Sequence, residues 1–87
     1  AIDPQRTDIH NLKGFCHFKM KNHGQAVECF KRVIELDPSS GIDYANVATN
    51  LRDLGRRDEA VHYYEQALSI DPTLDFAREN LELLKEA

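Results

Sequence analysis

Residues 58–72 read DEAVHYYEQALSIDP, and this stretch decides the fold. Small, aromatic and aliphatic residues recur in it at spacings of three and four, which indicates one face of an amphipathic helix. The residues of this face are Val61, Tyr64, Ala67 and Leu68. We expect Asp58 to cap the helix and Glu59 to interact favourably with its positive end. Pro72 ends the helix, because the residue before a proline is pushed out of helical geometry.

The Asp-Pro pair at the end of this stretch occurs three times along the chain. Pro4, Pro38 and Pro72 lie 34 residues apart, each follows an Asp, and each Asp follows an aliphatic residue. A fixed period of this length is the signature of a repeat protein. Aligning residues 7–40 with 41–74 supports the period, because residues of the same class fall at the same offsets. The matched pairs are Met20 with Leu54, Ala26 with Ala60, Val27 with Val61, Phe30 with Tyr64, and Ile34 with Leu68.

Each unit is predicted to form two helices joined by a short turn. The turns fall at Asn22-His23-Gly24 in the first unit and at Gly55-Arg56-Arg57 in the second. Ser40 with Asp43 resembles a capping box, and Thr73 can cap a fifth helix. The apolar stripes are Ile9, Leu12, Phe15, Cys16 and Met20; Ala26, Val27, Phe30, Val33 and Ile34; Tyr44, Val47, Ala48, Leu51 and Leu54; and Phe76, Ala77, Leu81 and Leu84.

A 34-residue helix-turn-helix unit with this pattern resembles the tetratricopeptide repeat. The positions that match the family's pattern are Tyr44, Val47, Ala48, Leu51, Ala60, Tyr64, Ala67 and Pro72 in the second unit, and His10, Lys13, Gly14, His17, Ala26, Phe30, Val33 and Pro38 in the first. The first helix departs from the family, because His10, Lys13 and His17 stand where the family prefers Trp, Leu and Tyr. Either this helix is a tolerant edge of the array, or it contacts an upstream unit or a partner.

The resemblance implies an all-α fold, an α-solenoid of antiparallel helix pairs, and a chain that is a fragment of a longer repeat array. Small residues would let paired helices approach closely, while Phe30 and Tyr64 would fill the space between units. Those small residues are Gly14, Ala26, Ala48 and Ala60. The expected units are 1–6, the tail of a preceding repeat; 7–40 and 41–74, two full repeats; and 75–87, a capping helix or the first helix of a third repeat.

Composition excludes several classes of protein. The chain has 87 residues, 41% of them hydrophobic and 30% charged, as in an ordinary soluble domain. It has no apolar run of about 18 residues that would span a membrane, and no signal-peptide pattern. The sequence does not determine the cellular compartment, and the cytoplasm is slightly favoured. The net charge of -4 gives no basic surface for nucleic acid.

The charge is uneven along the chain. Residues 1–40 hold six Lys and Arg against five Asp and Glu, a net of +1, and residues 41–87 hold five against ten, a net of -5. A solvated acidic face is the ordinary explanation, and a basic or mixed-charge partner is the alternative.

The resemblance also implies a concave groove lined by the first helix of each unit. The expected lining residues are Asn11, Phe15, Phe18, Lys19, Ile42, Asn46, Thr49, Arg52, Asp53, Phe76, Asn80 and Leu83. Phe15 and Phe18 are the candidate apolar anchors for a peptide; the alternative is that either ring packs against a neighbouring unit. Some family members clamp an acidic C-terminus with Lys, Asn and Arg. Only Asn46 matches that clamp, so we do not expect a dicarboxylate ligand.

The two cysteines, Cys16 and Cys29, could lie opposite each other across the first helix pair. A disulfide is conceivable, but two lone cysteines without metal-ligand spacing are usually buried thiols, and reduced thiols are the expectation. His10 and His17 lie two turns apart beside Cys16, which is a weak pattern for zinc, so no metal is expected. No phosphate-binding loop or nucleophile motif occurs, and neither a cofactor nor a catalytic site is expected.

These observations favour a protein–protein interaction module that binds a peptide or partner protein in the groove. Phe15 and Phe18 would be apolar anchors, and Asn46, Arg52 and Asn80 would be polar contacts. The alternative is a structural spacer, or a segment that self-associates through its exposed repeat ends.

Overall fold

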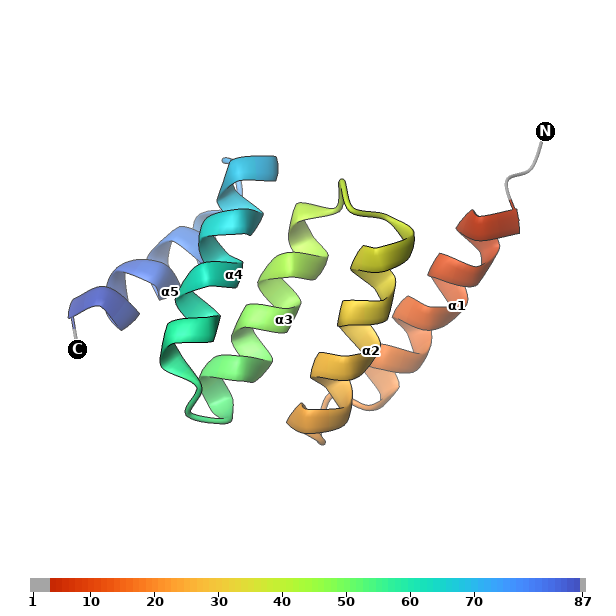
Figure 1. Ribbon diagram of the computed structural model, residues 1–87, viewed down its shortest axis with the longest axis horizontal. Coiled ribbons are helices and arrows are strands. Elements are labelled where there is room, and N and C mark those ends of the chain that lie inside the picture. The colour runs from red at the N-terminus through yellow and green to blue at the C-terminus, as the bar shows by residue number, and fades with distance from the viewer. Residues whose placement is uncertain (1–3, 87) are drawn as a thin grey trace.

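The computed structural model describes residues 4–86, with side chains from residue 8 onward. These residues form five α-helices and no strand, and each helix packs against the next one in the sequence (Figure 1). The molecule measures 46 × 27 × 16 Å, which is the elongated, thin shape of stacked helix pairs. The helices are α1 (Pro4–Phe18), α2 (His23–Leu36), α3 (Gly41–Asp53), α4 (Arg57–Ile70) and α5 (Asp75–Glu86). The predicted all-α solenoid is therefore confirmed.

The Asp-Pro pairs at residues 37–38 and 71–72 each follow the end of a helix, as the sequence predicts, whereas Pro4 is the first residue of α1. In both units the helix stops one residue before the Asp, whose backbone N–H still donates to a carbonyl of the last turn. The Asp side chain then holds the turn. Asp37 Oδ1 accepts a hydrogen bond of 2.7 Å from the Ser39 hydroxyl, and Asp71 Oδ1 accepts from the backbone N–H and the hydroxyl of Thr73 at 3.0 and 2.5 Å. These bonds explain why a hydroxyl residue follows Pro38 and Pro72.

The two hydrogen bonds from Thr73, first from its hydroxyl and then from its backbone N–H, lower the pKa of the Asp71 carboxyl. We expect Thr73→Val to raise the pKa of Asp71 toward its ordinary value, because valine keeps the shape and the N–H but removes the hydroxyl donor. A lowered pKa means that the fold favours the ionised form, so this contribution is lost as pH falls through the pKa of Asp71. A carboxyl-carbon NMR titration measures it. Ser39→Ala, which alters only the first unit, is the control; an unchanged pKa in Thr73→Val contradicts the assignment.

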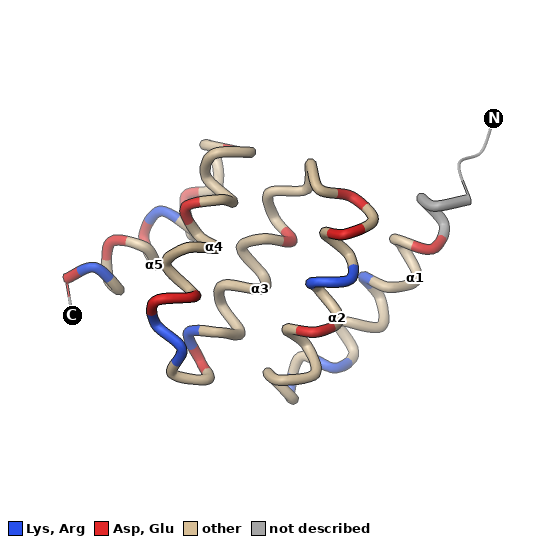
Figure 2. The backbone as a smooth tube through the Cα atoms, viewed as in Figure 1, with Lys and Arg blue, Asp and Glu red and all other residues tan. Residues whose placement is uncertain are grey.

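The core lies between the helices of neighbouring pairs, with α3 at its centre. Phe30 and Tyr64 have no exposed surface, and neither have Ala26, Ala48 and Ala60, as predicted. Figure 2 shows charged residues on α3 only near its two ends, which suits a helix enclosed by α2 and α4.

Tyr64 carries a buried hydroxyl that is satisfied within the core. Its oxygen lies 2.7 Å from Thr49 Oγ1 on α3. Burial raises the pKa of Tyr64, and the hydrogen bond to Thr49 offsets part of that rise. The ring is therefore buried among apolar side chains, while its hydroxyl has a hydrogen-bond partner.

Helix starts are where the sequence predictions fail. Asn22 is the N-cap of α2, since its Oδ1 accepts from the Gln25 N–H at 3.1 Å. Residues 22–24 are therefore a helix start and not a turn. Met20 and Leu54, which were expected within helical stripes, lie just past the ends of α1 and α3. Ser40 is the N-cap of α3 as expected, but its hydroxyl donates to Asp43 Oδ2 at 2.5 Å instead of accepting from the backbone.

Two predicted caps are wrong. Arg56 and not Asp58 is the N-cap of α4. Gly55, with a positive φ of 80°, follows Leu54, the C-cap of α3, so only Gly55 separates the two caps. Glu59 does sit in the first turn, where the Arg56 guanidinium donates to it at 2.7 Å. Thr73 does not cap α5, which begins at Asp75, because the Thr73 hydroxyl is bonded to Asp71.

The first helix is seated differently from its counterpart in the second unit. Gly14 was expected to allow a close helix approach, but a Cβ placed there would meet no atom within 4 Å, whereas the equivalent Ala48 is fully buried. Cys16 faces α2 of its own unit, while the equivalent Asn50 contacts His23, which belongs to the preceding unit. The side of α1 that faces its partner helix α2 therefore corresponds to the side of α3 that faces the preceding unit.

Candidate functional site

Two adjoining pockets lie in the α1–α2 seam, the surface between the first two helices. They have volumes of about 360 and 450 Å³ and share Leu12 and Phe15. The smaller is also lined by Asp8, Asn11, Arg32 and Leu36, and the larger by Lys19, Gly24, Gln25, Glu28 and Cys29. The seam therefore combines an apolar floor with polar and charged walls, which is the usual make-up of a binding surface.

Phe15 and Phe18 are the most conspicuous side chains of α1. Phe15 is 52% exposed and Phe18, the last residue of the helix, is 86% exposed. The Lys19 ammonium lies 4.6 Å from the centre of the Phe15 ring, a cation–π distance. Large exposed aromatic rings of this kind mark candidate contact sites.

A chain of polar side chains connects α2, α3 and α5. His23 Nε2 lies 3.7 Å from Asp53 Oδ2, and Arg52 donates to Asp53 Oδ1 from Nε at 3.1 Å and from Nη2 at 2.9 Å. Arg52 Nη1 also donates to Asn80 Oδ1. The guanidinium thus links the second unit to the helix that follows it.

The hydrogen bonds of Asn50 assign the tautomer of His23. Asn50 Nδ2 donates to the Asn46 carbonyl at 2.8 Å, so its Oδ1 is an acceptor. His23 Nδ1 lies 2.8 Å from that oxygen and must therefore carry the proton. Its other nitrogen, Nε2, is left facing the Asp53 carboxylate.

The structure brings the predicted groove residues together in two groups. Asn11, Phe15 and Lys19 line the seam pockets, and Arg52, Asp53 and Asn80 belong to the polar chain. Asn46 and Thr49 are half-buried on α3, where the Thr49 hydroxyl is bonded to Tyr64. The remaining residues, Phe18, Ile42, Phe76 and Leu83, are exposed apolar side chains outside both groups.

Residues of α2 that line the seam were not predicted. Gln25, Glu28, Arg32 and Leu36 recur at spacings of three and four on that helix. This second stripe, which runs beside the buried one, is the sequence pattern that could have indicated a surface lined by α2. His23 was also missed, because it was placed in the turn; Asn22 before it was a recognisable cap.

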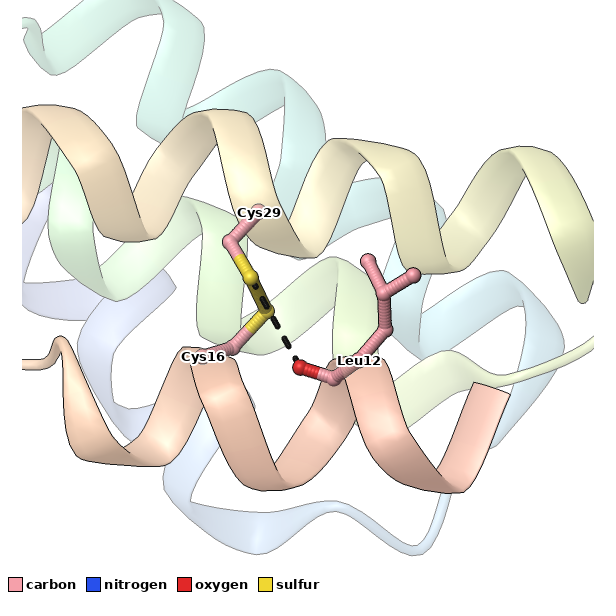
Figure 3. Close-up of a disulfide and its surroundings, with 3 residues drawn as sticks. All are labelled: Leu12, Cys16 and Cys29. Carbon is pink, nitrogen blue, oxygen red and sulfur yellow. Dashed lines mark hydrogen bonds between the residues drawn. A yellow bond between two sulfur atoms is a disulfide. The ribbon is translucent and has the colours of Figure 1, made fainter. Parts of the chain in front are cut away.

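Cys16 and Cys29 form a disulfide that joins α1 to α2, so the expectation of two reduced thiols is wrong (Figure 3). Their Cα atoms are 5.5 Å apart, within the range that a disulfide requires. The seating of α1 makes this possible, because it turns Cys16 toward α2. Cys29 Sγ also lies 3.6 Å from the Leu12 carbonyl oxygen. A bonded sulfur has no proton, so this contact is a hydrogen bond only when the pair is reduced.

Within residues 8–86, no group of three or more His, Cys, Asp or Glu side chains is placed to hold a metal ion. His10 and His17 are both exposed, and Cys16 is committed to the disulfide. Across the same part of the chain, no helix is both long and apolar enough to cross a membrane.

Comparison with known proteins identifies the repeat and several relatives. Models described as tetratricopeptide repeat match residues 7–40 and 42–74. A protein O-mannosyl-transferase of Caenorhabditis elegans is 31% identical over 83 residues, which are 95% of this chain and 12% of that protein. A STIP1 homolog of Dictyostelium discoideum is 35% identical over 66 residues, 76% and 12% of the two chains. A peroxisomal targeting signal receptor of Saccharomyces cerevisiae is 25% identical over 81 residues, 93% and 13%. The chain thus spans about an eighth of these relatives.

Proposed function

Because the chain belongs to the tetratricopeptide repeat family, we propose that it binds a peptide segment of a partner protein at the face that carries Phe15 and Phe18. The family is a non-catalytic protein-interaction fold built from stacked helix pairs. One relative is named a peroxisomal targeting signal receptor and another a protein O-mannosyl-transferase, and this chain matches 13% and 12% of those two proteins.

The exposure of Phe15 and Phe18 carries the proposal. An aromatic ring that is 86% exposed contributes almost nothing to the core, yet it offers a large apolar area at low cost in side-chain entropy. Such rings are enriched among the few residues that dominate binding energy. The seam pockets beside Phe15 would accept an apolar side chain of the peptide.

Polar contacts would orient the peptide backbone. Arg52 is partly exposed, and Asn46 and Asn80 lie half-buried on the neighbouring helices α3 and α5. Carboxamide and guanidinium groups can hydrogen-bond peptide carbonyls without requiring a particular sequence. Specificity would then come from the apolar anchors.

Selection of displayed random peptides on the intact chain tests the proposal. We expect Phe15→Ala and Phe18→Ala each to weaken binding of a selected peptide by about tenfold or more, or about 1.4 kcal/mol. Binding is measured by fluorescence polarisation, and circular dichroism checks the fold. Because both rings are largely exposed, we expect stability to change by no more than about 0.5 kcal/mol.

The matched controls are Glu65→Ala and Gln66→Ala, which alter exposed residues of α4. Unchanged affinity in both Phe variants, or selected peptides that lose affinity in the α4 variants instead, would reject the proposal. So would a selection that yields no binder.

Exposed apolar residues on α5 favour a second candidate, self-association through the repeat ends. Leu83 is 64% exposed and Phe76 is also exposed. A mass that rises with concentration in sedimentation equilibrium and returns to the monomer in Leu83→Glu would support it. A monomer at millimolar concentration would exclude it.

A further inference from the structure

The second unit has no counterpart of the Cys16–Cys29 disulfide. The residues at the same offsets in the second unit are Asn50 and Tyr63. The disulfide holds a helix with few other anchors: Ile9 is the other buried apolar residue among the described side chains of α1, and Gly14 faces open space. The ion pair of Lys13 with Asp43, at 3.2 Å, ties α1 to α3. The seating of α1 therefore depends strongly on one covalent bond.

The two sulfur-bearing residues differ in access. Cys16 has no exposed surface, whereas Cys29 is partly exposed and lines the larger seam pocket of about 450 Å³. The same pocket is lined by Lys19 and by Glu28, whose charges are opposite. A small molecule that enters the seam would thus reach Cys29 first, and would meet one cation and one anion on the way.

We propose that the larger seam pocket is a thiol-exchange site, in which a low-molecular-weight thiol attacks Cys29 and so releases α1 from α2. The exchange is a property of this chain apart from peptide binding. It makes the position of the helix that carries Phe15 and Phe18 responsive to the thiol status of the solution.

The chemistry balances with the thiol as the only co-reactant. The incoming thiolate forms a bond to Cys29 Sγ, the Cys16–Cys29 bond breaks, and Cys16 Sγ leaves with the electron pair and takes up a proton. A second thiolate then attacks the sulfur of the bound thiol. Cys29 Sγ leaves with the electron pair and takes up a proton, and the two thiol molecules depart joined by a disulfide bond. The free Cys29 thiol lies within reach of the Leu12 carbonyl, 3.6 Å away, and can donate to it.

Access decides which sulfur is attacked. Attack on Cys16 would require α1 to separate from α2 first, because Cys16 is fully buried. Attack on Cys29 makes the buried Cys16 sulfur the leaving group, and its burial slows the step. This route, however, needs no prior separation of the two helices. The two routes therefore predict different adducts and different responses to charge.

The adduct identifies the route. The chain, oxidised with glutathione disulfide, is incubated with reduced glutathione under native conditions, quenched with acid, blocked with N-ethylmaleimide and mapped by peptide mass spectrometry. We expect glutathione on Cys29 and N-ethylmaleimide on Cys16. Glutathione on Cys16 overturns the proposal, as does a chain whose cysteines do not form the bond on oxidation.

Charge variants test whether the thiol enters through the pocket. Glutathione is anionic, so we expect Lys19→Gln to lower its rate of exchange about two- to threefold at low ionic strength, and Glu28→Gln to raise it by a similar factor. The reacting thiolate of 2-mercaptoethanol carries one negative charge and that of glutathione carries two, so 2-mercaptoethanol should respond in the same direction but less strongly. Glu79→Gln on α5 is the remote control. Equal changes for both thiols in each variant would mean entry by helix opening and would overturn the pocket route.

Release of α1 is read by amide hydrogen exchange. In the reduced chain we expect exchange across residues 8–18 to accelerate by about tenfold or more, while α3 and α4 keep their protection. Unchanged protection of α1 after reduction overturns the claim that the bond holds the helix in place.

Discussion

Tyr64→Ala is expected to lower the free energy of unfolding by about 3–5 kcal/mol. The ring projects from α4, is fully buried in the hydrophobic core and contacts α3 through its hydroxyl, so its removal leaves a cavity in that core. A folded domain has only about 5–15 kcal/mol of stability, so the loss is a large fraction of the total. Urea denaturation followed by circular dichroism measures the change.

Tyr64→Phe is the matched control, because it keeps the ring and removes only the hydroxyl that pairs with Thr49. We expect a loss of about 1 kcal/mol. The raised pKa of Tyr64 means that the fold favours the neutral phenol. Stability is therefore full below the pKa of the unfolded chain and falls as pH rises toward the folded-state pKa, a dependence that Tyr64→Phe abolishes. A Tyr64→Ala chain as stable as Tyr64→Phe would contradict the central position of the ring.

Removing the disulfide in a Cys16→Ala, Cys29→Ala double variant is expected to cost about 3 kcal/mol, since the bond closes a loop across a sequence separation of 13. The unfolded chain gains the freedom that the bond denies it. Urea midpoints of the oxidised, reduced and double-variant chains measure the effect. The reduced wild type should match the double variant, and equal midpoints for the oxidised and reduced chains would contradict the role assigned to the bond.

The sequence predicts those parts of the fold that depend on local chemistry and period. Pro38 and Pro72 mark where helices end, because a proline acts on its immediate neighbour. Phe30 and Tyr64 recur at the repeat period and are both buried, because each repeat copies the packing of the other. These features need no knowledge of how one helix is turned against another.

The predictions that were wrong concern features that depend on how one helix is oriented relative to another. Nothing in the pattern around Gly14 indicates that α1 is turned differently from α3. The sequence therefore leaves the disulfide as the less favoured alternative and does not predict the seam pockets. The pockets take half of their walls from α2, at residues such as Glu28 and Arg32 that look like ordinary solvent-exposed positions. Arg56 and not Asp58 is the N-cap of α4, a difference of two residues that helix propensity does not decide.

An NMR titration of the isotope-labelled chain with a selected peptide tests the central claim most directly, that the protein captures peptides on the face of α1. The account predicts that the largest amide shifts fall on Phe15 and Phe18, with smaller ones at Arg52 and Asn80. A competing pocket of about 330 Å³ lies on α4, lined by His62, Glu65, Gln66 and Ser69. If the largest shifts fall there and α1 is unmoved, the account is contradicted.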